Sequence, residues 1–167
     1  AKDFDRYVKI DIKNFFPSIN LNILFNQISE KNTKLTEVDY FFMREFLLYL
    51  GEGKYPVIEN STALSYLVTM IYLEKSDELL SKYLNELDWI DEWKAVRFVD
   101  DLYVFYNSNI IDNSTNVWEL VKKYSDILFE FELKVNISKV SHDTTQAIYK
   151  DVKQTSFNNH YLESTNS

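Results

Sequence analysis

The sequence predicts an α+β domain in which helices pack on one face of an antiparallel sheet. Some stretches alternate apolar and polar residues, the period of a half-buried strand, and longer ones carry apolar residues three or four apart, the period of an amphipathic helix. They occur in the order strand, helices, hairpin, helix, strand, which favours this architecture. At 167 residues, 46% of them hydrophobic, the chain is long enough for one domain with a substantial core.

The first half of the chain contains one expected strand followed by helices. Residues 7–12, YVKIDI, alternate as a strand does, and Pro17 then breaks the pattern before a short helix over about 21–28. Thr36 and Asp39 have the spacing of a capping pair at the start of a second helix. That helix is expected to end at Gly51 or Gly53, and its apolar residues at helical spacing are Val38, Phe42, Phe46, Tyr49 and Leu50.

The second half begins with a long amphipathic helix expected over about 61–84. Two short strands, AVRFV and LYVFY, then join at Asp100-Asp101 as a hairpin with an acidic tip. A further helix is expected over 113–131, and a last strand at LKVNI that ends near residues 138–139. We therefore place one domain over residues 1–141. The polar residues 142–167 have too little apolar content to pack and form a tail or the start of a following domain.

Composition excludes several classes of site. The chain has no cysteine and only two histidines, so a disulfide framework or a zinc site is not expected, and any bound metal would have oxygen ligands. Two glycines are too few for a glycine-rich phosphate loop. No apolar run approaches the roughly 20 residues that span a bilayer, and the start of the chain does not resemble a signal peptide, so we expect a cytoplasmic protein. The net charge of −8 argues against strong nucleic-acid binding by this chain alone.

Three carboxylates are the candidate catalytic residues. Asp100 and Asp101 lie within an apolar and aromatic run, and Asp11 lies near the end of the first strand. Burying adjacent carboxylates without a partner is unfavourable, and a cation with a preference for oxygen, such as Mg²⁺, would relieve both burial and repulsion. The alternative is an ordinary solvated hairpin turn, since Asp is a common turn residue. No glycine or asparagine follows the pair, however, and its flanks are apolar.

Four segments resemble the palm motifs of reverse transcriptases in order and spacing, over most of residues 5–140: YVKIDIKNFFPSI, NSTALSYLVTMIYL, RFVDDLYVFY and LKVNISKV. The resemblance is greatest to the enzymes of bacterial abortive infection and phage defence. It implies a polymerase palm, a ferredoxin-like antiparallel sheet with helices on one face. The fingers and thumb subdomains are not recognisable, so we expect this chain to be the palm of a larger polymerase and nearly inactive alone.

The resemblance also implies roles for individual residues. Asp11, Asp100 and Asp101 match the metal-binding aspartates, and the carbonyl of Ile12 is a further candidate ligand. Two Mg²⁺ ions are implied, with Mn²⁺ as an alternative. Lys139 matches a catalytic lysine near the departing pyrophosphate, although a surface lysine is the simpler interpretation. Phe16 matches the residue that excludes a 2′-hydroxyl and selects deoxynucleotides, but a core aromatic after a strand explains it equally well.

One motif departs from the family pattern. Asn60 and Ser61 stand where family members usually have Gln-Gly against the templating base and the incoming nucleotide, whereas Ser65 matches the family's serine. This departure places ordinary templated copying in doubt. Untemplated synthesis primed by a protein hydroxyl, as in some defence-associated relatives, is consistent with it.

Two functions from different classes remain. The first is RNA-directed DNA polymerisation by two-metal nucleotidyl transfer from deoxynucleoside triphosphates, with DNA or RNA bound by the intact protein, in antiviral defence. The second is an inactive palm scaffold for protein interaction or homo-oligomerisation, which the negative charge and the altered residues favour. No membrane partner is expected.

Overall fold

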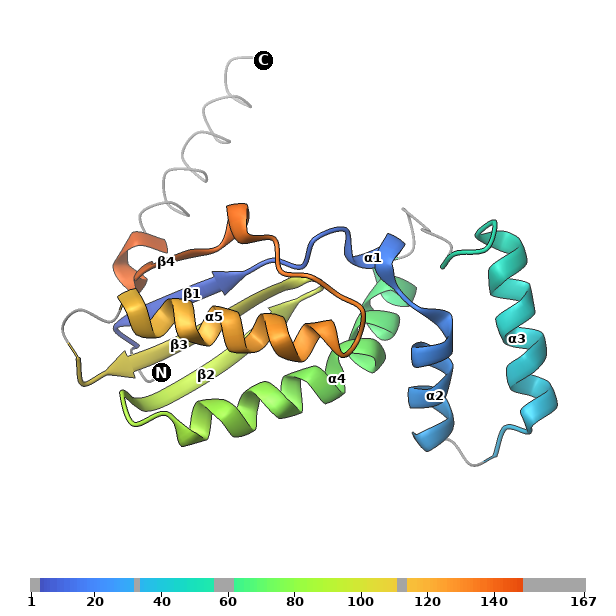
Figure 1. The fold of residues 1–167 in the computed structure, drawn as a ribbon, viewed down its shortest axis with the longest axis horizontal. Helices are drawn as coiled ribbons and strands as arrows, with labels where there is room; N and C mark the ends of the chain where they lie inside the picture. Colours follow the sequence, from blue (N-terminus) through green and yellow to red (C-terminus); the bar gives the residue numbers. More distant parts are fainter. Residues whose placement is uncertain (1–3, 32–33, 56–61, 111–113, 149–167) are drawn as a thin grey trace, which may run out of the picture.

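The computed structural model describes residues 4–31, 34–55, 62–110 and 114–148, and for residues 62–67 it describes the backbone only. Its centre is a four-stranded antiparallel sheet in the order β2-β3-β1-β4 (Figure 1). The strands are β1 (Arg6–Ile10), β2 (Ile90–Phe98), β3 (Asp101–Ser108) and β4 (Ser141–Thr144). The α+β architecture predicted from the sequence is confirmed.

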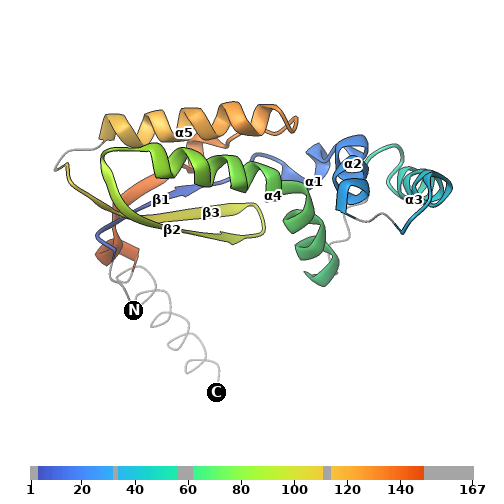
Figure 2. The ribbon, with the colours of Figure 1, turned by 90° about the horizontal axis from the view of Figure 1, so that it is seen from below.

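The two faces of the sheet differ because side chains alternate along each strand. Val8 pairs with Val104 across β1 and β3, and Ile10 pairs with Leu102. All four are buried, and their face is covered by α4 (Thr62–Glu86) and α5 (Ser114–Phe129), which lie side by side above the sheet (Figure 2). Neither α4 nor α5 lies on the opposite face (Figure 2). The domain therefore has two layers, with its hydrophobic core between the sheet and these two helices.

Three further helices extend from one end of the sheet. They are α1 (Phe15–Ser18), α2 (Leu21–Lys31) and α3 (Glu37–Leu50), and α3 lies at the far edge of the molecule (Figure 1). The fully buried Tyr72 of α4 connects this end to the core, because its hydroxyl donates to the Phe131 carbonyl (2.9 Å) and accepts from the Asn20 amide (3.1 Å). The capping pair predicted at Thr36 and Asp39 is present as a complete capping box.

Two features of the sheet differ from the prediction. The LKVNI segment forms a single bridge, between Val135 and Ile12, instead of a strand. The fourth strand is the polar segment Ser141–Thr144, which pairs with β1 at the sheet edge, so the sheet continues past residue 141. Its polar composition gave no strand signal, because an edge strand with three exposed residues needs little apolar surface. Residues 149–167, the greater part of the expected tail, lie outside the described residues.

Within the described residues, no helix is long and apolar enough to span a membrane.

Candidate active site

The three carboxylates come from two neighbouring strands. Asp11 directly follows β1, and β1 pairs with β3, which begins at Asp101. Phe98 pairs with Asp101, so the hairpin turn consists of Val99 and Asp100. The predicted acidic tip is thus corrected by one residue: Asp100 lies in the turn and Asp101 already belongs to the strand. Because β1 and β3 are antiparallel, the end of one lies beside the start of the other, and this brings Asp11 and the acidic pair together.

Asp11 is a buried carboxylate with two polar partners. Its side chain is 4% exposed, and its Oδ1 accepts a hydrogen bond from Asn136 Nδ2 (2.7 Å) and lies 3.2 Å from Lys139 Nζ. Its backbone carbonyl also accepts from the Asn136 amide (2.8 Å). Burial of a carboxylate is tolerated when hydrogen bonds and an opposite charge compensate for lost water. The segment after Val135 therefore supplies the hydrogen bond and the positive charge that the buried Asp11 carboxylate requires.

Asn136 is the residue whose role the sequence did not reveal. Its side-chain amide is oriented toward Asp11, because Ser138 Oγ donates to Asn136 Oδ1 (2.8 Å) and leaves Nδ2 to donate to the carboxylate. The two partners are 125 positions apart in the chain. Local sequence patterns carry no information about a contact at that separation.

Asp100 has a raised pKa. Burial is the largest cause, and the nearby negative charges of Asp11 and Asp101 add to it, while a backbone hydrogen bond and Lys139 act in the opposite direction. The carboxylate is thus destabilised in its ionised form, and a cation at this position would stabilise it. Among the groups in the site, Asp100 shows the electrostatic strain that a metal ligand relieves.

Asp101 lies on the face of the sheet opposite α4 and α5, which we call the open face. Its carboxylate pairs with Lys9 Nζ at 2.9 Å, and Lys9 lies on β1 opposite Tyr103 of β3. Burial lowers the pKa of Lys9, but hydrogen bonds to Asp101 and Tyr103 outweigh this and raise it overall. Lys9 therefore stays charged at neutral pH and compensates Asp101.

The fit of this site to Mg²⁺ depends on how many carboxylates face one point. Within the described residues, no three His, Cys, Asp or Glu side chains converge closely enough to hold an ion. The charge of Asp11 acts on Asp100 and raises its pKa, however, and carboxylate oxygens are the kind of ligand that Mg²⁺ prefers. Protein sites for Mg²⁺ commonly use one or two carboxylates and leave other positions to phosphate oxygens and water. The pair fits an ion that arrives together with a phosphate ligand.

The other predicted residues are distributed around this pair. Lys139 is brought to Asp11, although its side chain remains 64% exposed. The bridge at Ile12 is formed by hydrogen bonds of the Asp11 carbonyl and the Lys13 amide, and it does not use the Ile12 carbonyl. Phe16 is partly buried and stacks on Tyr55, with ring centroids 6.4 Å apart, which is consistent with both interpretations of this residue. Asn60 and Ser61 lie outside the described residues, and so does the side chain of Ser65.

A partly buried ion pair anchors the hairpin that carries Asp100. Arg97 of β2 forms a bidentate ion pair with Asp77 of α4, in which Nε lies 2.8 Å from Oδ2 and Nη2 contacts Oδ1. Arg97 Nη2 also donates a hydrogen bond to the Tyr124 hydroxyl of α5 (2.6 Å). Burial raises the pKa of Tyr124 to about 12, so the hydroxyl stays protonated at neutral pH. Since a bidentate Arg–carboxylate pair fixes geometry as well as charge, both covering helices hold the hairpin.

Comparison with known proteins supports this architecture. No family model and no curated protein matches the sequence. The structure is similar to that of apo telomerase from Candida tropicalis truncated from the C-terminal domain, with a TM-score of 0.56, 16% identity, and coverage of 86% of this chain and 31% of that one. A second apo telomerase structure from the same organism matches at a TM-score of 0.49 and 14% identity, over 88% of this chain and 30% of that one.

The first similarity shows the fold. The chain has a reverse-transcriptase-like palm fold and spans about a third of the length of the telomerase chain that it matches.

Asn136→Ala should lower the free energy of unfolding by about 1–3 kcal/mol, because the buried Asp11 carboxylate would lose its closest donor. The matched control is Lys134→Ala, an exposed residue two positions away, for which a change within about 0.5 kcal/mol is expected. Urea unfolding at pH 7 measures both. Equal midpoints for the two variants would contradict the role assigned to Asn136.

Asp100→Asn should be at least as stable as the native chain at pH 7. A folded-state pKa raised above 3.8 means that the folded protein binds more protons than the unfolded one in the pH range above that value. The contribution of Asp100 is therefore favourable at low pH and is lost as the pH rises through its folded-state pKa. Urea midpoints between pH 3.5 and 7 should fall less steeply with pH in the variant, and an unchanged slope would show that Asp100 is not strained.

Proposed function

We propose that this chain is the palm of a reverse transcriptase, an RNA-directed DNA polymerase that transfers deoxynucleotides with two divalent ions. The observation that carries the proposal is the proximity of Asp100, with its raised pKa, to the buried Asp11 within a reverse-transcriptase-like fold. A structural role alone would favour a neutral side chain at Asp100, because its charge opposes burial. A metal-dependent role accounts for the carboxylate.

In this proposal each residue has a separate task. Asp11 and Asp100 would hold two Mg²⁺ or Mn²⁺ ions, with Asp101 and the Ile12 carbonyl as further ligands. Bound there, the ions would supply activation of the attacking hydroxyl and neutralisation of the triphosphate's leaving oxygens. Lys139 would release Asp11 and protonate the departing pyrophosphate. Phe16 would restrict the sugar to deoxynucleotides, and Asn60, Ser61 and Ser65 would adjoin the incoming nucleotide.

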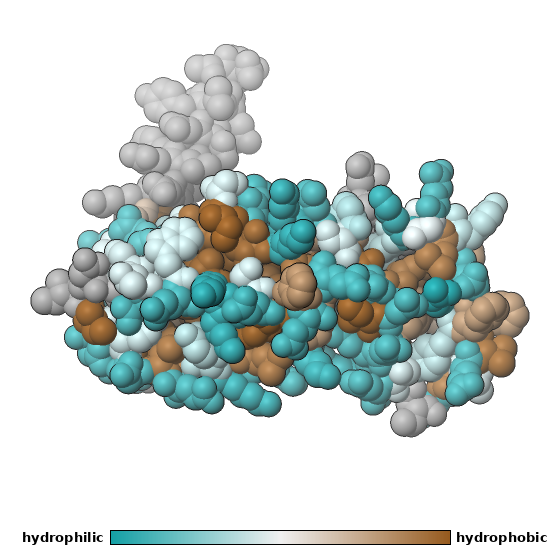
Figure 3. All heavy atoms as spheres, in the orientation of Figure 1, coloured by the Kyte–Doolittle hydropathy of each residue, from teal (hydrophilic) through white to brown (hydrophobic). Residues whose placement is uncertain are grey.

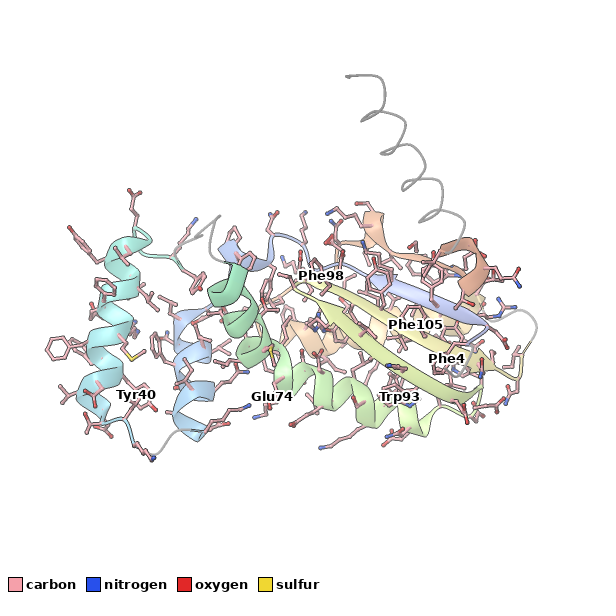
Figure 4. The ribbon with its side chains drawn as sticks, turned by 180° about the vertical axis from the view of Figure 1, so that it is seen from behind. Phe4, Tyr40, Glu74, Trp93, Phe98 and Phe105 are labelled. Atoms are coloured by element: carbon pink, nitrogen blue, oxygen red, sulfur yellow. The ribbon has the colours of Figure 1, made fainter. Side chains whose placement is uncertain are left out.

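The open face of the sheet supports a nucleic-acid substrate. Tyr103 and Phe105 stack there with ring centroids 6.2 Å apart and planes 11° apart, and Lys9 lies over the Tyr103 ring at 5.4 Å. Phe98 and Phe105 both lie on this face, with α5 on the far side of the sheet (Figure 4). Aromatic side chains beside a positive charge are the features that bind bases of a single strand without sequence preference.

The biological setting is part of the same proposal. The resemblance to bacterial abortive-infection enzymes supports a role in phage defence in the cytoplasm, and the departure at Asn60-Ser61 is consistent with untemplated or protein-primed synthesis. The second candidate, an inactive scaffold, is favoured by one observation: Lys9 and Lys139 already compensate Asp101 and Asp11 without any ion.

Incorporation of labelled deoxynucleotides by the complete native polypeptide, with Mg²⁺ or Mn²⁺ and with or without template, tests the proposal. Asp100→Asn should reduce incorporation about 100-fold or more, because charge stabilisation at the reacting phosphate is lost. The control is Asp126→Asn on the exposed side of α5, which should retain full activity. Equal incorporation by native protein and Asp100→Asn would refute the metal role, and no incorporation by a folded native protein under any condition would support the scaffold.

A further inference from the structure

Helix α3 exposes an unusually large apolar surface. Seven of its fourteen residues are large hydrophobic side chains that are at least 43% exposed, and Tyr49 reaches 83%. We call them the α3 face: Val38, Phe41, Phe42, Met43, Phe46, Tyr49 and Leu50. Each aromatic side chain carries roughly 150–250 Å² of surface, so the exposed part amounts to several hundred Å² and approaches the ~800 Å² that one partner contributes to a standard interface.

The opposite side of α3 already has its partner. Tyr40 contacts the Phe25 ring of α2 edge-on, at 6.4 Å between centroids, and Arg44 Nε donates to Asn22 Oδ1 of α2 (3.0 Å). Figure 4 shows Tyr40 between α3 and α2, and Figure 3 shows apolar side chains at the end of the molecule that α3 forms. Within the described part of the chain, the α3 face points away from the domain. Monomeric proteins rarely leave such a surface uncovered.

The pattern of the α3 face is self-complementary. Val38, Phe42, Phe46 and Leu50 recur every four residues, and reversing the helix about position 44 exchanges 38 with 50 and 42 with 46. A twofold axis at that point would place each of these four apolar side chains against another of the four in a second copy. An isologous interface requires this property, and an unrelated partner does not.

Charge selects the antiparallel arrangement. Glu37 and Asp39 make the first turn of α3 acidic, whereas the exposed Glu52 and Lys54 after its C-terminal end balance each other in charge. In a parallel pair the acidic ends would meet and repel each other. In an antiparallel pair the acidic end of one copy approaches the end of the other that has no net charge, which removes the repulsion, and the two helix dipoles run in opposite directions.

We propose that the α3 face is a homodimer interface in which two copies of α3 pack antiparallel about a twofold axis. The proposal follows from the surface of α3 and does not depend on nucleotide chemistry at the carboxylates. It also gives the chain an aromatic-rich contact of the composition found in the cores of protein interfaces.

Light scattering of the 167-residue chain after gel filtration, at tens of micromolar, tests the proposal. The native chain should have twice the mass of one chain, and Phe46→Asp should have the mass of one, with an unchanged circular dichroism spectrum because the side chain is 60% exposed. The control is Phe129→Asp, an aromatic side chain of α5 that is 72% exposed and does not belong to the α3 face, which should remain dimeric. A monomeric native chain, or dimers of Phe46→Asp, would overturn the proposal.

Cysteine cross-linking tests the orientation independently of any loss of folding. The chain has no cysteine, so single substitutions report one contact each. An equimolar mixture of Val38→Cys and Leu50→Cys chains should form disulfide-linked dimers on mild oxidation, whereas either variant alone should form several-fold fewer. Equal or greater cross-linking within either variant alone would contradict the antiparallel arrangement.

Discussion

The burial of the Asp11 carboxylate is the constraint on which the site depends. A carboxylate at 3% exposure in the folded chain requires partners, and both of them come from the segment after Val135, far along the sequence. This requirement explains why LKVNI crosses the end of β1 as a single bridge instead of continuing as a strand. The bridge brings the Asn136 amide and the Lys139 ammonium to one oxygen, and only then does the chain turn back to form β4.

The hairpin opposite Asp11 combines two unfavourable features at adjacent residues. Val99 has a φ of 56°, in the left-handed region where a β-branched residue is rare, and the next residue is Asp100, whose charge burial disfavours. Either feature alone would be removed by a common substitution, glycine at the first position or asparagine at the second. Strain of this kind concentrates at functional sites, where surrounding structure holds it in place. Here the Arg97–Asp77 ion pair and the Tyr124 hydroxyl provide that support from the covering helices.

The sequence predicted the parts of the fold that depend on local periodicity. The helices α2 to α5 and the hairpin were all expected near their observed positions, and Asp11 was expected at the end of the first strand. What local patterns could not show was pairing at long range: the polar β4, the Asn136 contact with Asp11, and the register that puts Asp100 in the turn and Asp101 in the strand. Periodicity also gave α3 correctly as a helix without showing that its apolar residues remain exposed, because spacing identifies a face and not what covers it.

The central claim is that Asp11 and Asp100 form a divalent-ion site when a triphosphate is present. Electron paramagnetic resonance of Mn²⁺, titrated with the chain in the presence of a deoxynucleoside triphosphate, tests it most directly because free and bound Mn²⁺ give different signals. The claim predicts that adding the native chain depletes free Mn²⁺ beyond what the triphosphate alone removes. Asp100→Asn should bind at least about 10-fold more weakly, and Asp126→Asn as well as the native chain. Depletion that is absent from the native chain, or equal in Asp100→Asn, would contradict it.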